Sequence, residues 1–97
     1  MPFEKFDRSK LDILPLDQRI SDIDISVVMD PELPPPPFEN PKLDEIADAV
    51  IRARKLGAEV IMMYGAHVIR TGNARFMIKL MEQGLVTHFA TNGAGTI

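Results

Sequence analysis

Small residues follow two apolar segments of this sequence, and these are the positions where ligand chemistry is easiest to place. Residues 59–64, EVIMMY, are followed by Gly65-Ala66-His67, and residues 85–90, LVTHFA, are followed by Thr91-Asn92-Gly93-Ala94-Gly95. Small residues let the backbone approach a ligand closely, and backbone N–H groups ahead of a helix can hold a phosphate. The pattern therefore predicts a nucleotide-binding crevice. Tight turns alone are the alternative interpretation, because the second segment lacks the full G-x-G-x-x-G fingerprint.

The histidines and aspartates give weaker signals. His67 follows the first apolar segment, where a ligand contact and a backbone hydrogen bond are both reasonable; His88 lies within the second segment and is expected to be structural. The chain has no cysteine, and no C-x-x-C or H-E-x-x-H pattern accompanies the histidines, so we expect no metal site. Asp22, Asp24 and Asp30 stand in an irregular region and are expected to be solvated. These patterns identify no catalytic residue.

The two apolar segments and the residues between them predict a strand, a helix and a second strand. We expect a loop over 65–72 and a helix over 74–83 that Gly84 ends. A strand–helix–strand unit of this length is right-handed and implies parallel neighbours. Ligands bind at the carboxyl ends of the strands in an open parallel sheet, so the residues after both strands should face one crevice. The 74–83 helix has only a narrow polar stripe, which predicts burial on more than one side, for example by a partner subunit.

A further helix is predicted from Pro41 to the region of Gly57. Asn40 is a suitable N-cap, and Pro41 stands at the first helical position, where its missing N–H costs nothing. Apolar residues then recur at helical spacing, with acidic residues early and basic residues late, which suits the helix dipole. The fold class expected is α/β, a partial Rossmann-like parallel sheet preceded by an extended N-terminal arm.

Residues 1–39 differ in character from residues 40–97. Ile20, Ile23, Ile25 and Val27 are spaced by two or three, which is weak evidence for an extended or strand-like arm lying against another surface. The prolines at 34–37 favour polyproline II and predict a stiff spacer, and a docking site for an SH3-like domain is the functional alternative. We therefore divide the chain into an arm with a Pro-rich linker, 1–39, and a Rossmann-like part, 40–97.

Composition excludes several classes of function. The chain of 97 residues is 45% hydrophobic and 26% charged, as is ordinary for a globular protein. Its net charge of −3 gives no electrostatic footprint for nucleic acid or for an anionic membrane. No long apolar run is present, so neither a secretory signal nor a membrane span is expected, and the expected location is cytoplasmic.

The segment from Gly65 to Ile97 resembles the deoxyhypusine synthase family, in particular its bacterial deoxyhypusine synthase-like members. The family carries Ser-Asn-Leu-Ile-Ser-Ser-Gly after one strand and Thr-Thr-Ala-Gly-Gly after the next. Without a gap these fall on Ala66–Gly72 and on Thr91–Gly95, with Ile69, Gly72, Thr91 and Gly95 identical. The match covers about the last third of the chain.

The resemblance implies an NAD-binding Rossmann-like fold and a homotetramer with cofactor sites at subunit interfaces. It also implies transfer of an aminobutyl group from spermidine, or a related polyamine, to an amine or lysine acceptor. Carried over by position, the residues expected to bind NAD are Ala66, His67, Val68, Ile69, Arg70, Thr91, Asn92, Gly93, Ala94 and Gly95.

Departures from the family pattern limit what the resemblance implies. Ala66-His67 replaces Ser-Asn, and Arg70 adds a cation that could meet a phosphate or an acidic substrate. The family's polyamine-binding glutamates would follow near Ile97, and its catalytic lysine has no counterpart within residues 1–97. We therefore expect the N-terminal part of a longer enzyme, or a truncated product that needs partner subunits. The alternative is a non-catalytic interaction or oligomerisation module with at most weak nucleotide binding.

Overall fold

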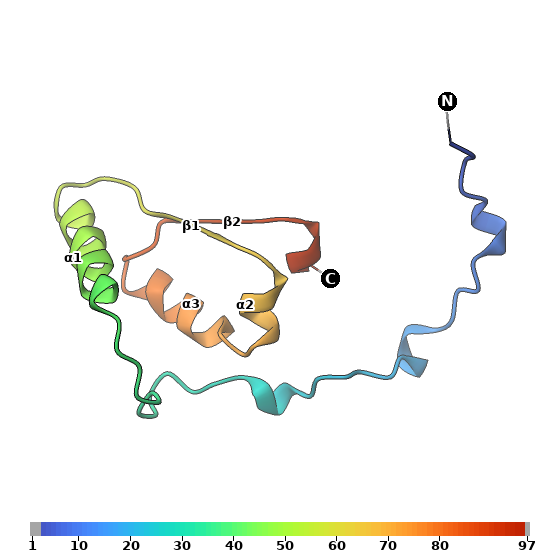
Figure 1. Cartoon of the computed structure of the whole chain (residues 1–97), viewed down its shortest axis with the longest axis horizontal. Helices are drawn as coiled ribbons and strands as arrows, with labels where there is room; N and C mark the ends of the chain where they lie inside the picture. The colour runs from blue at the N-terminus through green and yellow to red at the C-terminus, as the bar shows by residue number, and fades with distance from the viewer. Residues whose placement is uncertain (1–2, 97) are drawn as a thin grey trace.

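A computed structural model describes residues 3–96, which form a small α/β unit with a long N-terminal arm (Figure 1). Two strands, β1 (Ile61–Tyr64) and β2 (His88–Thr91), form a parallel sheet, and α2 (Ala66–Arg70) and α3 (Ala74–Glu82) connect them. The α1 helix (Pro41–Lys55) precedes β1, and a 3-10 turn (Gly93–Thr96) follows β2. The expected order of strand, helix and parallel strand is therefore confirmed at the level of an α/β unit.

The α1 helix begins and ends where its sequence predicts. The Asn40 side chain accepts a hydrogen bond from the Lys42 N–H at 3.0 Å, which satisfies one of the free donors of the first turn. Pro41 occupies the first helical position, and Gly57 lies just beyond the end with a φ of 75°. Helices commonly end with a residue in the left-handed conformation at this position, and glycine adopts that conformation without the cost of a Cβ clash.

The strands are shorter than expected, and residues 66–70 form a helix that the sequence did not predict. The sheet covers 61–64 and 88–91 in place of the expected 59–64 and 85–90. The expected loop after β1 was wrong, because α2 occupies most of it. At the end of α2 the His67 carbonyl accepts hydrogen bonds from the Thr71 N–H at 2.9 Å and the Thr71 hydroxyl at 2.8 Å, so the turn is closed locally.

The arm is extended but is not a strand. Three short 3-10 turns interrupt it, at Arg8–Lys10, Leu16–Gln18 and Ile25–Val27. Asp7 and Asp24 cap the first and third turns through bonds from the N–H of Ser9 and Ser26, at 3.0 and 2.8 Å. Of the two forms expected over 20–27, extended or strand-like, the extended one is found and no strand forms, because local side-chain caps compete with strand pairing. The arm runs alongside α3 and α2 and then away from the sheet (Figure 1).

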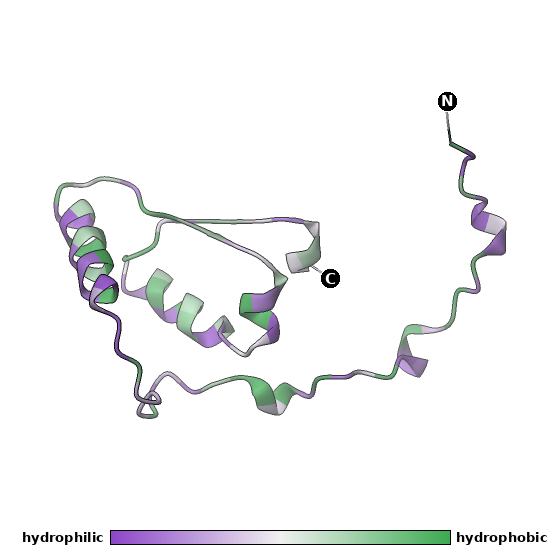
Figure 2. Cartoon of the chain, viewed as in Figure 1, coloured by the Kyte–Doolittle hydropathy of each residue, from purple (hydrophilic) through white to green (hydrophobic). Residues whose placement is uncertain are grey.

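Little of the described chain is buried. Met77 on α3 and Val86 before β2 are the buried hydrophobic side chains of residues 3–96, with 7% and 8% of their surface exposed. Figure 2 shows hydrophobic residues along the arm and on every helix. On α3, Ile78 and Met81 remain about half exposed. A single chain therefore does not provide the burial on more than one side that the sequence predicted for this helix.

Candidate functional site

The two strand ends meet at one edge of the sheet. The register pairs Tyr64 with Thr91, so the chain leaves β1 and β2 at the same level. The segments that follow, α2 and the Gly93–Thr96 turn, then contact one another. The carboxyl ends of parallel strands are where open α/β sheets bind ligands, and the structure forms a cleft at this position.

This cleft has a volume of about 530 Å³ and three walls. One wall comes from α2, one from the turn after β2, and one from the N-terminal arm. We call it the strand-end cleft, and its lining residues are Arg19, Ser21, Asp22, Ile23, Val27, Ala66, Ile69, Arg70, Ala94 and Gly95. Volumes of this size are typical of small-molecule sites.

Five of the ten residues expected to bind NAD line the strand-end cleft. They are Ala66, Ile69, Arg70, Ala94 and Gly95, and they come from both sides of the predicted crevice. Thr91 and Asn92 line a second, shallower hollow together with residues 63–65 and Ala90. His67, Val68 and Gly93 line neither, and the side chain of His67 is exposed.

Thr91, the last residue of β2, leaves no room for a side chain at Gly95. A Cβ at this position would collide with the Thr91 hydroxyl and lie 3.2 Å from the Thr91 Cβ. The turn is held by a hydrogen bond from the Gly95 N–H to the Asn92 carbonyl at 3.0 Å, and by one from the Thr96 hydroxyl to the Gly93 carbonyl at 2.8 Å. A Cβ at Gly93, by contrast, would meet no neighbour within 4 Å.

The charged side chains of the cleft favour an anion. Arg70 on α2 and Arg19 on the arm both line it, and Asp22 is the single carboxylate among the lining residues. Guanidinium groups bind phosphate and carboxylate through paired N–H donors, and the cationic excess raises the local concentration of anions. Ile23, Val27 and Ile69 supply the apolar part of the lining.

The arm is the part of this site that the sequence did not indicate. It is held against the α2–α3 turn by a hydrogen bond from the Met29 N–H to the Gly72 carbonyl at 3.0 Å. Two ion pairs follow, between Asp30 and Arg75 at 3.4 Å and between Glu32 and Lys79. The expectation that Asp30 is only solvated is therefore corrected. The spacing of apolar residues hinted at a buried side, but these long-range partners cannot be read from local spacing.

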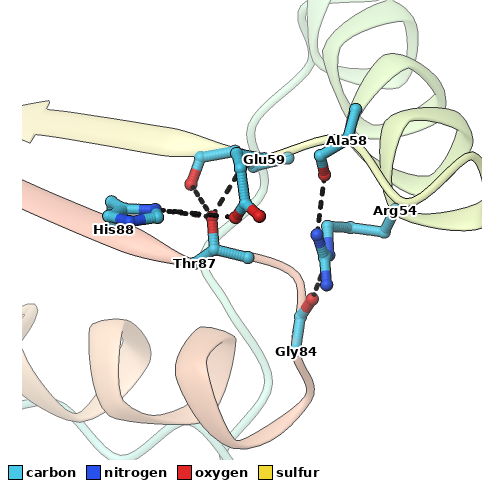
Figure 3. Close-up of polar contacts among 7 residues, drawn as sticks. Arg54, Ala58, Glu59, Gly84, Thr87 and His88 are labelled. Atoms are coloured by element: carbon cyan, nitrogen blue, oxygen red, sulfur yellow. Dashed lines mark hydrogen bonds and ion pairs between the residues drawn. The ribbon is translucent and has the colours of Figure 1, made fainter.

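A second polar cluster lies at the opposite edge, where the strands begin (Figure 3). The Thr87 hydroxyl oxygen lies 3.0 Å from the Val60 N–H nitrogen, the Val60 carbonyl oxygen and the His88 Nδ1. His88 Nδ1 is also 3.6 Å from a Glu59 carboxylate oxygen. The Thr87 hydroxyl lowers the pKa of Glu59 against the opposing effect of desolvation, and the neighbouring His88 and Arg54 side chains lower it further. These contacts join the strand starts and agree with a structural role for His88.

Residues 3–96 contain no group of three His, Asp or Glu side chains placed to hold a metal ion. Nor does this part of the chain form a helix of the length and apolarity needed to cross a membrane. Comparisons with protein-family models, with curated proteins and with solved structures found no significant match.

Proposed function

We propose that the strand-end cleft is part of an NAD site in an enzyme of the deoxyhypusine synthase type. The enzyme would have a Rossmann-like domain and would transfer an aminobutyl group from spermidine or a related polyamine to an amine or lysine acceptor. The observation that carries this proposal is the meeting of α2 and the turn after β2 in one cleft. A cytoplasmic location belongs to the same proposal.

The lining residues fit parts of a dinucleotide. Ala66, Ala94 and Gly95 are small enough to admit a ligand close to the backbone, and Arg70 offers a cation for a phosphate. Ile69 and the apolar arm residues would cover a sugar or a ring. NAD, when bound, would supply a hydride acceptor, and these residues would bind and orient it. No side chain of the cleft is assigned a catalytic role.

A homo-oligomer forms part of the proposal, because one chain leaves too much surface exposed. The accessible surface is 8945 Å², whereas a compact monomer of this size exposes about 5,500 Å². Met63 on the open sheet and Leu56 after α1 are each 81% exposed. Association with further copies of the chain would cover such side chains. The resemblance to the deoxyhypusine synthase family implies a tetramer.

The same exposure supports a second candidate function. A chain that presents this much apolar surface could serve as an interaction or oligomerisation module without chemistry of its own. Nucleotide binding separates the two candidates, because a module of this kind needs no anion-binding cleft.

Isothermal titration calorimetry with NAD tests the proposal. The 97-residue chain should bind NAD with one site per chain, and Arg70→Gln should weaken binding about tenfold because a charge-assisted hydrogen bond to phosphate is lost. Arg52→Gln is the matched control: Arg52 is an exposed cation on α1 that is not among the residues lining the cleft. It should leave the affinity unchanged.

Two results would count against the proposal. The absence of NAD binding by a folded, assembled chain would favour the interaction module. Equal effects of Arg70→Gln and Arg52→Gln would show that any binding is a general charge effect and not a property of the cleft.

A further inference from the structure

We infer that residues 19–23 of the arm are a functional wall of the strand-end cleft, in which Arg19 and Arg70 together hold the phosphates of a bound dinucleotide. This inference deepens the proposed function and rests on it. It assigns a ligand-binding role to the arm, which by sequence is expected only to lie against another surface.

The choice of Arg19 follows from the cleft itself. Four cationic residues lie in the arm, at positions 5, 8, 10 and 19, and Arg19 is the one that lines the cleft. Arg70 reaches the same cleft from α2, about fifty residues further along the chain. With Asp22 as the single carboxylate among the lining residues, the two guanidinium groups leave the cleft cationic even though the chain has a net charge of −3. A ligand with two phosphate groups can pair with both guanidinium groups, whereas a ligand with a single anionic group can pair fully with only one of them.

The apolar residues of the arm differ in exposure according to whether they line the cleft. Ile23 and Val27 line it and are 36% and 39% exposed, whereas Ile20 and Ile25 are 90% and 84% exposed. The next turn of the arm, Ile25–Val27, is capped by Asp24, which accepts a hydrogen bond from the Ser26 N–H at 2.8 Å. Of residues 19–23, all but Ile20 line the cleft.

A close backbone contact fixes the arm next to the cleft. Gly72 is buried between α2 and α3 with a φ of 88°, and a Cβ there would collide with the Val27 carbonyl. Only a glycine allows the arm to lie this close at this φ. The Met29–Gly72 hydrogen bond and the two ion pairs then continue the attachment along α3. Two of these four contacts are ionic and partly exposed, so high salt should loosen the arm.

Binding of two probes, NAD and inorganic pyrophosphate, tests the inference by calorimetry. Arg19→Gln should weaken binding of each about tenfold, as Arg70→Gln does, because each variant removes one charge-assisted contact to phosphate. Arg8→Gln is the matched control, since Arg8 is an exposed cation of the same arm that does not line the cleft. It should change neither affinity.

A double substitution separates a contact to the ligand from a general effect on the fold. Gly72→Ala should move the arm away and weaken NAD binding as much as Arg19→Gln does. The two changes combined should then cost no more than either alone, because both act through the same arm. Gly57→Ala, at a glycine of similar φ with no neighbour within 4 Å of its Cβ position, controls for backbone strain.

The outcomes distinguish this inference from the proposed function. NAD binding that depends on Arg70 but not on Arg19 would overturn the role of the arm and leave the NAD site in place. Pyrophosphate binding that depends on both arginines without NAD binding would support the arm and overturn the NAD site. Additive losses in the double variant would also contradict a shared action through the arm.

Discussion

Gly72 is the residue on which the position of the arm depends most directly. Its positive φ and its contact with the Val27 carbonyl act together, because a side chain would be strained by the first and blocked by the second. By sequence this glycine lies at the end of the expected loop over 65–72, where a turn residue is ordinary. The contact with the arm, which is about 45 residues away in sequence, is visible only in the fold.

We predict that Gly72→Ala destabilises the chain more than Gly57→Ala does. Both residues have positive φ, so each substitution should cost about 1–2 kcal/mol in backbone strain. Gly72→Ala adds displacement of the arm. Urea unfolding measures the free energy of both variants, and limited proteolysis should cut residues 3–30 faster in Gly72→Ala alone. Equal proteolysis of both variants would show that the arm does not depend on this contact.

Glu59 predicts how stability changes in acid. The Thr87 hydroxyl, with smaller effects from the His88 and Arg54 side chains, lowers its pKa below the ordinary value of 4.5. A lowered pKa in the folded state means that the carboxylate stabilises the fold at pH values above 4.5, and that this contribution is lost as the pH falls through the lowered pKa. The effect should be small, because the carboxylate is largely exposed.

Thermal unfolding at pH 7 and at acidic pH checks this second prediction. Glu59→Gln should lower the melting temperature at pH 7 and have less effect in acid, where the natural carboxylate is protonated. Glu39→Gln, at an exposed residue of the linker, provides the comparison. A loss that is the same at both pH values would contradict an ionised Glu59 in the folded chain.

Arg54 links the end of α1 to the segment that leads into β2. Its Nε donates to the Gly84 carbonyl at 2.9 Å, and its Nη1 donates to the Ala58 carbonyl at 2.6 Å (Figure 3). One guanidinium thus fixes the turn after α1 and the turn after α3. The sequence shows a basic residue late in a helix, which suits the dipole, but it does not show this cross-link.

We predict that Arg54→Ala costs about 1–2 kcal/mol of stability, because two hydrogen bonds to carbonyl groups are lost at a half-buried position. Arg54→Lys should recover part of the loss, since one ammonium cannot reproduce the planar fork. Arg52→Ala, at an exposed position of the same helix, should cost little. Denaturant unfolding of the three variants measures this order, and equal losses for Arg54→Ala and Arg52→Ala would contradict it.

The elements that the sequence predicted well are those with local signals. Asn40, Pro41 and Gly57 mark α1 because capping and left-handed turns are properties of a few neighbouring residues. The predicted βαβ order and the parallel pairing also follow from the lengths of apolar segments. The α2 helix was missed because it is a five-residue helix next to Gly65 and Gly72, and both glycines suggested a loop.

Part of the candidate site was predicted, again because its sequence signals are local. Small residues after the two strands identified Ala66, Ala94 and Gly95, because their position relative to a strand is a local property. Arg19 and Ile23 were not expected in the cleft, since their place depends on how the arm packs against the turn near Gly72. Because residues 65–72 were expected to form a loop, it could not be predicted which side chains of 66–70 would line the cleft.

The chain as a whole is too extended to be a compact monomer. Its radius of gyration is 19.2 Å, whereas a compact domain of this length has about 12–13 Å. Two buried hydrophobic side chains among residues 3–96 are a small core for folding alone. Stability and assembly are therefore expected to be coupled, so that dilution should lower the melting temperature.

We predict that the chain sediments as an oligomer and that the exposed side of α3 contributes to the contact. Met81→Asp should shift the assembly toward smaller species, because a charge would be buried at an apolar interface. Gln83→Asp introduces the same charge at an exposed polar position at the end of the same helix and should leave assembly unchanged. Sedimentation velocity at several concentrations measures both. A monomer that unfolds cooperatively at all concentrations would contradict this account.

The most direct test of the central claim is to map where NAD binds on the isotope-labelled chain by NMR titration. We predict saturable changes in amide chemical shift at residues 66–70 and 94–95, with smaller changes at residues 19–23 of the arm. Amides near Glu59 and Thr87, at the opposite edge of the sheet, should not change. An absence of shifts, or shifts confined to that opposite edge, would contradict a dinucleotide site at the strand-end cleft.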